Sequence, residues 1–491
     1  MKILLGMDVG TQGVRVLASA ADGHILARTL KKFDLPGLPN PTLHEQDARL
    51  WWQATAACLR EVVEALGRGD ASARDIVAVC ADSTSGTVLP VSKSGEPLAN
   101  AIMYNDGRAV TEAEEINAAA PAHCATHGYR FSASYALAKI LWLKRRQPAL
   151  FDAAWKIIHA TDYISGMLTG DFGKTDLSSA LKTGCDLIGE RWPAFIEGKL
   201  GIPLSKLPEL GPSGRVIGTV SAACAAQTGL STETQVCAGM TDGTAAFLAS
   251  GARQIGDFNS TLGTTLVLKG NWERILVDPQ GRIYTHKHPA GWWLPGGASN
   301  VGGECLAVRF EGKDLQALDR AAMKCAPTDL VIYPLVRNGE RLPFADPRAT
   351  GFIADHMGTL DILQCEEDVF YAAHLEGVAY VERLCYEVME SLGVKVNPVI
   401  YTTGAASKSR EWRTIRASVL GRALALPECA DSAFGACVLA AGRIVHDGLV
   451  AASKAMVRIK EETPPNPRWV DIYQQRYEKF KEICRRKGYI S

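Results

Sequence analysis

Two short segments that combine glycine with threonine could bind phosphate groups. Residues 8–13 read Asp-Val-Gly-Thr-Gln-Gly, and residues 263–265 read Gly-Thr-Thr. Glycine permits tight turns with positive φ, and the backbone N–H groups of such turns can surround an anion. Asp8 would tolerate a nearby phosphate only with a divalent cation such as Mg²⁺ between them. The alternative for the first segment is an ordinary hairpin turn with a solvated carboxylate.

A third segment could supply a general base. Residues 239–246 read Gly-Met-Thr-Asp-Gly-Thr-Ala-Ala and follow an apolar run at 235–238. Asp242 is therefore expected at the end of a strand, directly before a helix. A carboxylate there can accept the proton of a hydroxyl group that attacks phosphorus, which accelerates such reactions by about 10²- to 10⁴-fold. The alternative is that Asp242 only caps the helix.

Polar side chains cluster after two further apolar runs. Residues 82–87 read Asp-Ser-Thr-Ser-Gly-Thr, and residues 104–108 read Tyr-Asn-Asp-Gly-Arg. Such clusters suit a polyhydroxylated ligand, because each sugar hydroxyl group can both donate and accept a hydrogen bond. The glycine-rich segments 296–303 and 404–407 would let the backbone approach a flat or anionic ligand. Ordinary loops also use these residue types, so each segment alone leaves both interpretations open.

An α/β fold must position these segments. Residues 2–7, 13–20, 25–30 and 76–81 are predicted as strands, and residues 47–66 as a helix with Asp47 as its N-cap. A strand is also expected at 399–402, and a charged, amphipathic surface helix at 469–489. The Gly-Thr step followed by an alternating apolar strand occurs in both halves of the chain. This repetition predicts two lobes of similar design, divided near residues 248–256.

The composition excludes several classes of protein. The 53 Lys and Arg residues balance the 53 Asp and Glu residues, which argues against a nucleic-acid-binding protein. With 47% hydrophobic and 22% charged residues, the chain is neither disordered nor collagen-like. No apolar run approaches the roughly 18 residues of a membrane span. The 13 cysteines contain no CxxC pair, so a cytoplasmic location without disulfides is expected.

Together, the segments resemble the FGGY family of carbohydrate kinases over nearly the whole chain, from Met7 to about Arg443. Residues 8–11 resemble the first phosphate motif of the family, residues 161–180 its central signature, and residues 239–246 its catalytic segment. The resemblance implies an α/β fold of two actin-like, ribonuclease H-like lobes with ATP and Mg²⁺ in an interlobe cleft. Residues 1–248 would form the sugar-binding and catalytic lobe, and residues 249–491 the nucleotide-binding lobe.

The resemblance also implies roles for individual residues. Asp242 would be the base, Asp8 a second catalytic residue, and both would be Mg²⁺ ligands. Sugar contacts are expected from Asp8, Thr11, Ser85, Gly86, Asn105, Asp106 and Asp242. Nucleotide contacts are expected from Gly10, Thr11, Gln12, Gly263, Thr264, Thr265, Gly302, Gly303, Gly404, Ala405, Ser409 and Trp412. Relatives commonly carry Gly-Gly-Gly-Ala where residues 404–407 read Gly-Ala-Ala-Ser, and the two added methyl groups leave the nucleotide preference open.

Within the family, residues 82–89, 103–106 and 284–287 resemble the D-ribulose kinase branch. Typical xylulose kinases have a Met-His-Gly-Gln type of segment where residues 84–87 read Thr-Ser-Gly-Thr. We therefore expect ATP-dependent conversion of a ketopentose, D-ribulose, to its 5-phosphate. D-xylulose and other ketoses or polyols are alternatives. A partner-binding, actin-like ATPase is a further alternative, although it would not need the polar clusters. The oligomeric state, including a homodimer, is left open.

Overall fold

The chain forms two compact units. The computed structural model describes residues 1–34, 42–69, 71–359 and 365–490. The first unit contains Met1–Arg253, His286–Trp292 and Cys429–Arg458, and the second contains Gln254–Thr285, Trp293–Glu428 and Ile459–Ser491. Each unit has its own buried apolar core. The predicted consecutive lobes are 1–248 and 249–491. Two segments from the second of these ranges, residues 286–292 and 429–458, group with the first unit.

The first unit is built on a six-stranded sheet with the order β11-β12-β5-β1-β2-β3. The strands are β1 (Ile3–Val9), β2 (Gly13–Ala20), β3 (Ile25–Lys32), β5 (Ile76–Ser83), β11 (Val216–Thr219) and β12 (Gln235–Thr241). Strands β1, β5 and β12 are parallel, whereas β2, β3 and β11 are antiparallel to their neighbours. The strands predicted in these regions are confirmed, and β5 continues two residues beyond its predicted end.

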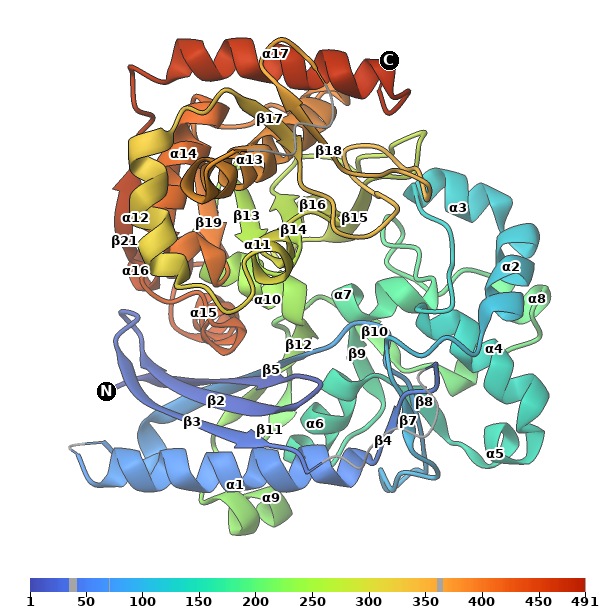
Figure 1. The fold of residues 1–491 in the computed structure, drawn as a ribbon. Helices are drawn as coiled ribbons and strands as arrows, with labels where there is room; N and C mark the ends of the chain where they lie inside the picture. Colours follow the sequence, from blue (N-terminus) through green and yellow to red (C-terminus); the bar gives the residue numbers. More distant parts are fainter. Residues whose placement is uncertain (35–41, 70, 360–364, 491) are drawn as a thin grey trace. The chain divides into compact units, whose positions relative to one another are not determined.

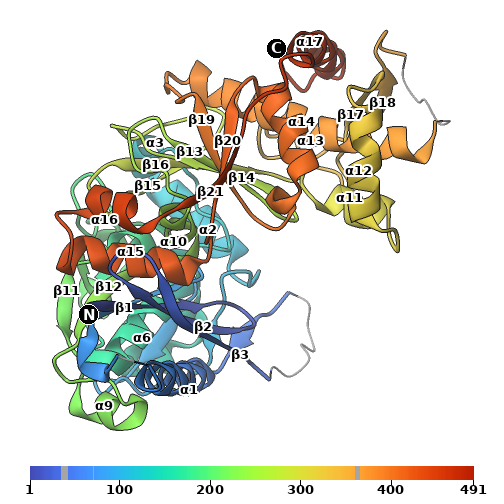
Figure 2. The same cartoon turned by 90° about the vertical axis from the view of Figure 1, so that its left-hand side faces the viewer.

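Helices cover both faces of this sheet, as Figures 1 and 2 show. Helix α1 (Ala48–Gly67) packs against β2 and β3, and helix α15 (Ser432–Ile444) packs against β1 and β5. Asp47 caps α1 by accepting a hydrogen bond from Arg49 N, as predicted. A Cβ atom on Gly6 would lie 1.7 Å from the carbonyl oxygen of Ala433. Helix α15 thus rests directly on the backbone of β1, which explains why residues 429–458 belong to the first unit.

Smaller elements complete the first unit. They are β4 (Glu45–Gln46), β6 (Leu89–Val91), β7 (Ala101–Ile102), α2 (Val110–Ala119), α3 (Pro121–His127), α4 (Ala136–Arg146), α5 (Pro148–Ala153), β8 (Lys156–Ile158), α6 (Ala160–Thr169), β9 (Lys174–Asp176), α7 (Leu177–Ala180), α8 (Phe195–Gly198), β10 (Glu209–Gly211), α9 (Ala222–Thr228), α10 (Asp242–Ala249) and α16 (Leu449–Met456). Most of them lie in the two long connections of the sheet, from β5 to β11 and from β12 onward.

The second unit has a seven-stranded sheet of similar arrangement, with the order β15-β16-β14-β13-β19-β20-β21. The strands are β13 (Phe258–Leu262), β14 (Leu266–Gly270), β15 (Tyr284–Lys287), β16 (Trp293–Ser299), β19 (Val399–Thr403), β20 (Ala423–Pro427) and β21 (Ile459–Thr463). The antiparallel strands β16-β14-β13 correspond to β3-β2-β1, and the parallel strands β13-β19-β20 to β1-β5-β12. Both sheets end in an antiparallel edge strand, but β11 precedes β12 in the sequence whereas β21 follows β20. The repeated strand order agrees with the two lobes of similar design that the sequence predicted.

Helices α13 (Glu367–Ser391) and α14 (Arg410–Leu420) pack together beside the second sheet, with α12 (Leu315–Cys325) against both (Figure 2). The remaining elements of this unit are α11 (Glu304–Arg309), β17 (Leu330–Tyr333), β18 (Phe352–Asp355) and α17 (Val470–Arg486). Helix α17 buries Tyr473, Tyr477 and Phe480, which confirms the predicted amphipathic helix. None of the helices in the described ranges has both the length and the apolar character required to cross a membrane.

Candidate active site

Three carboxylates lie at or beside the carboxyl ends of neighbouring parallel strands in the first unit. Asp8 in β1 is the register partner of Asp82 in β5, and Thr241, the last residue of β12, is the partner of Ser83. Asp242 follows Thr241 directly. Because ligands of open α/β sheets bind beyond the carboxyl ends of the strands, this edge is the candidate catalytic centre.

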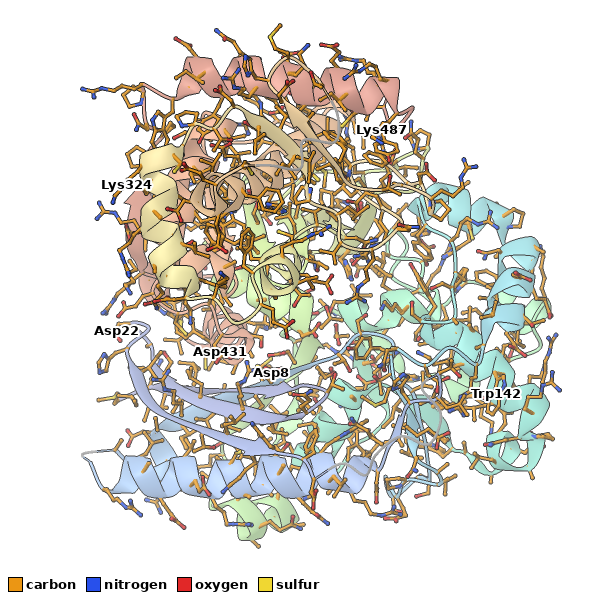
Figure 3. The ribbon with its side chains drawn as sticks, in the orientation of Figure 1. Asp8, Asp22, Trp142, Lys324, Asp431 and Lys487 are labelled. Atoms are coloured by element: carbon orange, nitrogen blue, oxygen red, sulfur yellow. The ribbon has the colours of Figure 1, made fainter. Side chains whose placement is uncertain are left out.

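Asp8 is nearly buried, with 8% of its surface exposed, and an arginine on the adjacent strand pairs with it. Arg15 is its register partner in β2, and Arg15 Nη1 lies 3.2 Å from Asp8 Oδ2 and 3.8 Å from Asp431 Oδ1. Figure 3 labels both aspartates. Burial raises the pKa of Asp8, and the Arg15 charge opposes this shift. The pKa of Asp8 is raised overall, because burial outweighs the charge of Arg15.

Asp82 is fully buried, and its carboxyl group shares a side-chain hydrogen bond with that of Asp8. Burial raises its pKa well above the usual range, and the charges of Asp8, Asp242 and Asp431 raise it further. These effects place Asp82 in the same electrostatic neighbourhood as both predicted catalytic carboxylates. Asp82 is not among the predicted site residues, although an acidic residue directly after an apolar run is a visible signal in the sequence.

Asp242 is the first residue of α10 and not its cap. The N-cap is Thr241, whose backbone N–H donates to Ser178 Oγ at 3.0 Å. Ser178 Oγ in turn donates to Asp176 Oδ1 at 2.6 Å. The central signature therefore holds the backbone immediately before Asp242, whose Oδ1 accepts a hydrogen bond from Gly243 N at 2.6 Å in the first turn of the helix.

Two lysines that the sequence analysis missed hold the predicted sugar-binding loop. Lys182 Nζ donates to the carbonyl oxygen of Ser85 at 3.0 Å, and Lys139 Nζ donates to that of Gly86 at 2.9 Å. Burial lowers the pKa of Lys139 to about 7. Burial also lowers the pKa of Lys182, and the nearby negative charge of Asp242 opposes this shift. Lys182 therefore links the loop electrostatically to the candidate base.

The structure separates the roles of Asn105 and Asp106. Asn105 is exposed in the turn after β7. Asp106 is buried, and its carboxylate accepts hydrogen bonds from Arg108 Nε and Nη2, both at 2.8 Å, and from His44 N at 2.7 Å. Arg108 also lies over the ring of Trp142, 4.8 Å from its centre. The carboxylate of Asp106 thus positions Arg108, a role that the sequence did not predict.

The turn between β1 and β2 is closed by a hydrogen bond from Gly10 N to Gly13 O at 3.0 Å. Thr11 O accepts a hydrogen bond from Gln46 Nε2 at 2.8 Å, and Gln12 is exposed. The expectation that the glycines adopt positive φ is wrong, since neither Gly10 nor Gly13 does so. Close packing explains Gly13 instead, because a Cβ atom there would lie 2.4 Å from the carbonyl oxygen of Lys31.

The second unit contains a pocket of about 1030 Å³ beside the turn between β13 and β14. Six residues predicted to bind nucleotide line it, namely Gly263, Thr264, Gly303, Ala405, Ser409 and Trp412. Ligand-binding pockets commonly have volumes of about 300–1,000 Å³, so the methyl groups of residues 405 and 406 leave room for a nucleotide. Tyr371 adds an aromatic side chain to the wall of the pocket, and Leu306 adds an apolar one.

Three other predicted nucleotide-binding residues do not line this pocket but lie within or pack against the turn beside it, namely Thr265, Gly302 and Gly404. A Cβ atom on Gly302 would lie 2.5 Å from the carbonyl oxygen of Thr264. Gly303 N donates to the carbonyl oxygen of Gly263 at 2.7 Å. The glycine-rich segment after β16 thus packs against the Gly-Thr-Thr turn, and the two segments form one wall.

Comparison with known proteins identifies the family. Residues 3–249 match the N-terminal domain of the FGGY family of carbohydrate kinases, and residues 259–443 match its C-terminal domain. The chain belongs to this family. It is therefore a sugar kinase, a phosphotransferase with an alcohol group as acceptor, and its fold is the actin-like fold of FGGY kinases. The predicted family, enzyme class and fold class are confirmed.

Individual relatives are similar over their full length. The chain is 26% identical to the xylulose kinase of Escherichia coli K12 over 498 residues, which cover 98% of each chain. It is 25% identical to the autoinducer-2 kinase of Klebsiella pneumoniae over 522 residues, covering 98% of this chain and 94% of the relative. The crystal structure of xylulose kinase from Rhodospirillum rubrum superposes with a TM-score of 0.86, at 27% identity and 99% coverage of both chains. Sugar kinases of this family use ATP, normally with Mg²⁺.

Proposed function

We propose that this FGGY kinase transfers the terminal phosphoryl group of ATP to the terminal hydroxyl group of a ketopentose. The observation that carries the proposal is the position of Asp242, which begins α10 directly after β12, near Asp8 and Asp82 and within electrostatic range of Lys182. A carboxylate at that position can hold a hydroxyl group and take its proton. A partner-binding ATPase would not need this arrangement beside a hydroxyl-rich loop.

In the proposed reaction, the sugar oxygen forms a bond to the terminal phosphorus while the bond from phosphorus to the departing ADP breaks. Asp242 accepts the hydroxyl proton, and the positive charge of Lys182 lies within electrostatic range of it. In the second unit, the turn at residues 263–265 and the pocket beside it bind ATP. Asp8, with Asp242 near it, would hold Mg²⁺, which offsets negative charge on the phosphate oxygens when bound.

The paired carboxylates of Asp8 and Asp242 are compatible with a cation held mainly by the substrate phosphates. Mg²⁺ usually keeps several waters and takes only one or two protein carboxylates besides the phosphate oxygens. No group of three or more potential ligand side chains converges on one point within the described ranges. An open site that relies on few carboxylates and on the phosphates of the substrate is consistent with both facts.

D-xylulose is the first candidate for the sugar, because several full-length relatives are xylulose kinases. D-ribulose, the expectation from the sequence, remains the second candidate. The observation that favours it is the loop at residues 84–87, in which hydroxyl groups and glycine replace the segment typical of xylulose kinases. The two sugars differ only in configuration at C3, so one or two hydrogen bonds from this loop could decide between them.

The proposed location is a reducing compartment, the cytoplasm. All 13 cysteines lie in the described part of the chain, and no disulfide links any two of them. Free, mostly buried thiols are typical of proteins that function under reducing conditions. We propose no oligomeric state.

A panel of sugars tests the proposal. ADP release would be measured by a coupled assay with D-xylulose, D-ribulose, L-ribulose and ribitol, and the kcat/KM values compared. Stimulation by a ketopentose supports the proposal, and the larger kcat/KM selects between D-xylulose and D-ribulose. ATP hydrolysis that is unaffected by every sugar would refute it and favour a partner-binding ATPase.

A further inference from the structure

We propose that Glu340 is a positioning residue for nucleotide binding, which fixes the glycine-rich segment that forms one wall of the nucleotide pocket. This inference rests on the proposed function, since it assumes that the pocket of the second unit binds ATP. Glu340 lies in the connection between β17 and β18 and is 4% exposed. It is not one of the residues that line the pocket. Its effect on the nucleotide would therefore pass through the residues that it contacts.

The carboxylate of Glu340 accepts four hydrogen bonds. Its Oε2 accepts from Ser299 Oγ at 2.8 Å and from Tyr333 Oη at 2.9 Å. Its Oε1 accepts from Asn300 N at 2.7 Å and from Arg341 N at 2.8 Å. All four partners donate, which suits the acceptor-only carboxylate group. Burial raises the pKa of Glu340, and these hydrogen bonds oppose the shift. Glu340 thus fixes the end of β16, although it lies 40 residues from Asn300 in the sequence.

The end of β16 leads directly to the Gly-Thr-Thr turn beside the pocket. Ser299 Oγ also accepts a hydrogen bond from Val301 N at 3.0 Å, and Val301 O accepts one from Leu266 N in β14 at 2.8 Å. Two residues later, Gly303 N donates to Gly263 O at 2.7 Å. Gly263 and Gly303 both line the pocket. A short series of contacts therefore joins the Glu340 carboxylate to the pocket wall.

The two glycines of this wall explain why an anchor beside them is needed. Gly302 and Gly303 have no side chains that could hold the backbone by packing, and glycine has more backbone freedom than any other residue. Gly302 has to be a glycine, because a Cβ atom there would lie 2.5 Å from Thr264 O. The conformation of the wall must therefore be fixed by neighbouring residues.

The loop that carries Glu340 contacts the chain on both sides of the two glycines. Before them, Asn300 Nδ2 donates to Gly339 O at 2.8 Å, in addition to the contacts of Glu340. After them, Glu304 forms an ion pair with Arg337. The side chain of Arg337 is 77% exposed, and exposed ion pairs contribute little. The buried carboxylate of Glu340 is thus the main restraint that this loop places on the wall.

Calorimetric titration of the full chain with ADP tests the inference. Glu340→Gln keeps the size of the side chain but replaces one acceptor oxygen with an NH₂ donor. Ser299→Ala removes the hydroxyl group that joins Glu340 to the glycine-rich segment. Tyr333→Phe is the matched control, because it removes the other hydroxyl group that donates to the same Oε2, from β17. We expect Glu340→Gln and Ser299→Ala to bind ADP about 5- to 10-fold more weakly, the scale of one lost buried hydrogen bond. Tyr333→Phe should bind ADP as the wild type does.

Steady-state kinetics provide a second measurement that a purely structural role would not change. The KM for ATP should rise by a similar factor in Glu340→Gln and Ser299→Ala, whereas the KM for the best sugar should stay unchanged, because the predicted sugar contacts lie in the first unit. Urea denaturation identifies the variants that remain folded, and Ser299→Ala keeps the test decisive if Glu340→Gln does not fold.

Three results would overturn the inference. Unchanged ADP affinity in the folded variants, with ADP bound by the wild type, would refute only the role of Glu340. An equal loss of ADP affinity in Tyr333→Phe would show that general loosening of the second unit, and not the contact with the wall, weakens binding. Absence of ADP binding by the wild type would overturn both this inference and the assignment of the pocket. The titration contains no sugar, so failure of the sugar panel would leave its outcome readable.

Discussion

A buried glutamate in helix α13 makes the stability of the second unit depend on pH. Glu376 is fully buried and accepts hydrogen bonds from Thr328 N at 2.9 Å, Thr328 Oγ1 at 2.6 Å and Tyr473 Oη at 3.0 Å. Burial raises its pKa from 4.5 to about 7, although these hydrogen bonds oppose the shift. The folded protein therefore holds the proton of Glu376 more tightly than the unfolded chain does.

The sign and size of the effect follow from linkage. The stabilisation by the bound proton is fully present below pH 4.5 and is lost as the pH rises through 7. At 1.36 kcal/mol per pKa unit, the loss is roughly 3 kcal/mol in the free energy of unfolding. We predict that Glu376→Gln, which stays neutral, matches the wild type near pH 5 and is more stable by roughly 2–3 kcal/mol near pH 8.

Urea denaturation of both proteins at several pH values between 5 and 8 measures this difference. Glu390→Gln changes an exposed carboxylate on the same helix and serves as the matched control, with no comparable pH dependence expected. A stability difference between Glu376→Gln and the wild type that stays constant across this range would refute the reasoning.

Two further predictions concern the second unit. Gly404 has a φ of +94°, and a Cβ atom there would lie 2.3 Å from the carbonyl oxygen of Leu262. Gly404→Ala should therefore lower the free energy of unfolding by about 1–3 kcal/mol. It should also weaken ADP binding, measured by calorimetric titration. Gly421→Ala is the control, since Gly421 has a φ of +63° and open space around it, and equal ADP affinity in both variants would contradict a supporting role for Gly404. Arg416 and Glu382 form a fully buried ion pair, in which Arg416 Nε donates to Glu382 Oε2 at 2.7 Å and Arg416 Nη2 to Glu382 Oε1 at 2.8 Å. Arg416→Met should therefore lower the free energy of unfolding, measured by urea denaturation, by about 3–5 kcal/mol. The double variant with Glu382→Leu should recover most of that loss. A double variant no more stable than Arg416→Met would contradict this account of the pair.

Much of the fold could be predicted because local signals agree with the final structure. Asp47 before an amphipathic run marked the start of α1, and the apolar runs around the Gly-Thr steps marked β1, β2 and β14. The end of β5 was placed two residues early, because Asp82 and Ser83 are polar. In the folded chain, these residues pair with Asp8 and Val9 of β1 and are buried there. Polarity alone does not distinguish such a strand end from a loop.

The candidate site was only partly predictable for a related reason. Asp8, Asp242 and the Gly-Thr-Thr turn belong to short local motifs, which the sequence displays directly. Asp82, Lys139 and Lys182 matter because of contacts between segments far apart in the chain, such as that of Lys182 with Ser85. Likewise, nothing within residues 429–458 indicates that α15 packs against Gly6. These features depend on tertiary packing, which no local pattern encodes.

The proposed base offers the most direct test of the account. Turnover of Asp242→Asn with ATP and its best sugar would be measured beside ADP binding by the same protein. The exposed Asp22→Asn variant serves as the control for loss of a charge. We predict unchanged ADP binding and a fall in turnover of about 10²-fold or more. Turnover equal to that of the wild type, with ADP still bound, would contradict the assignment of Asp242 as the base.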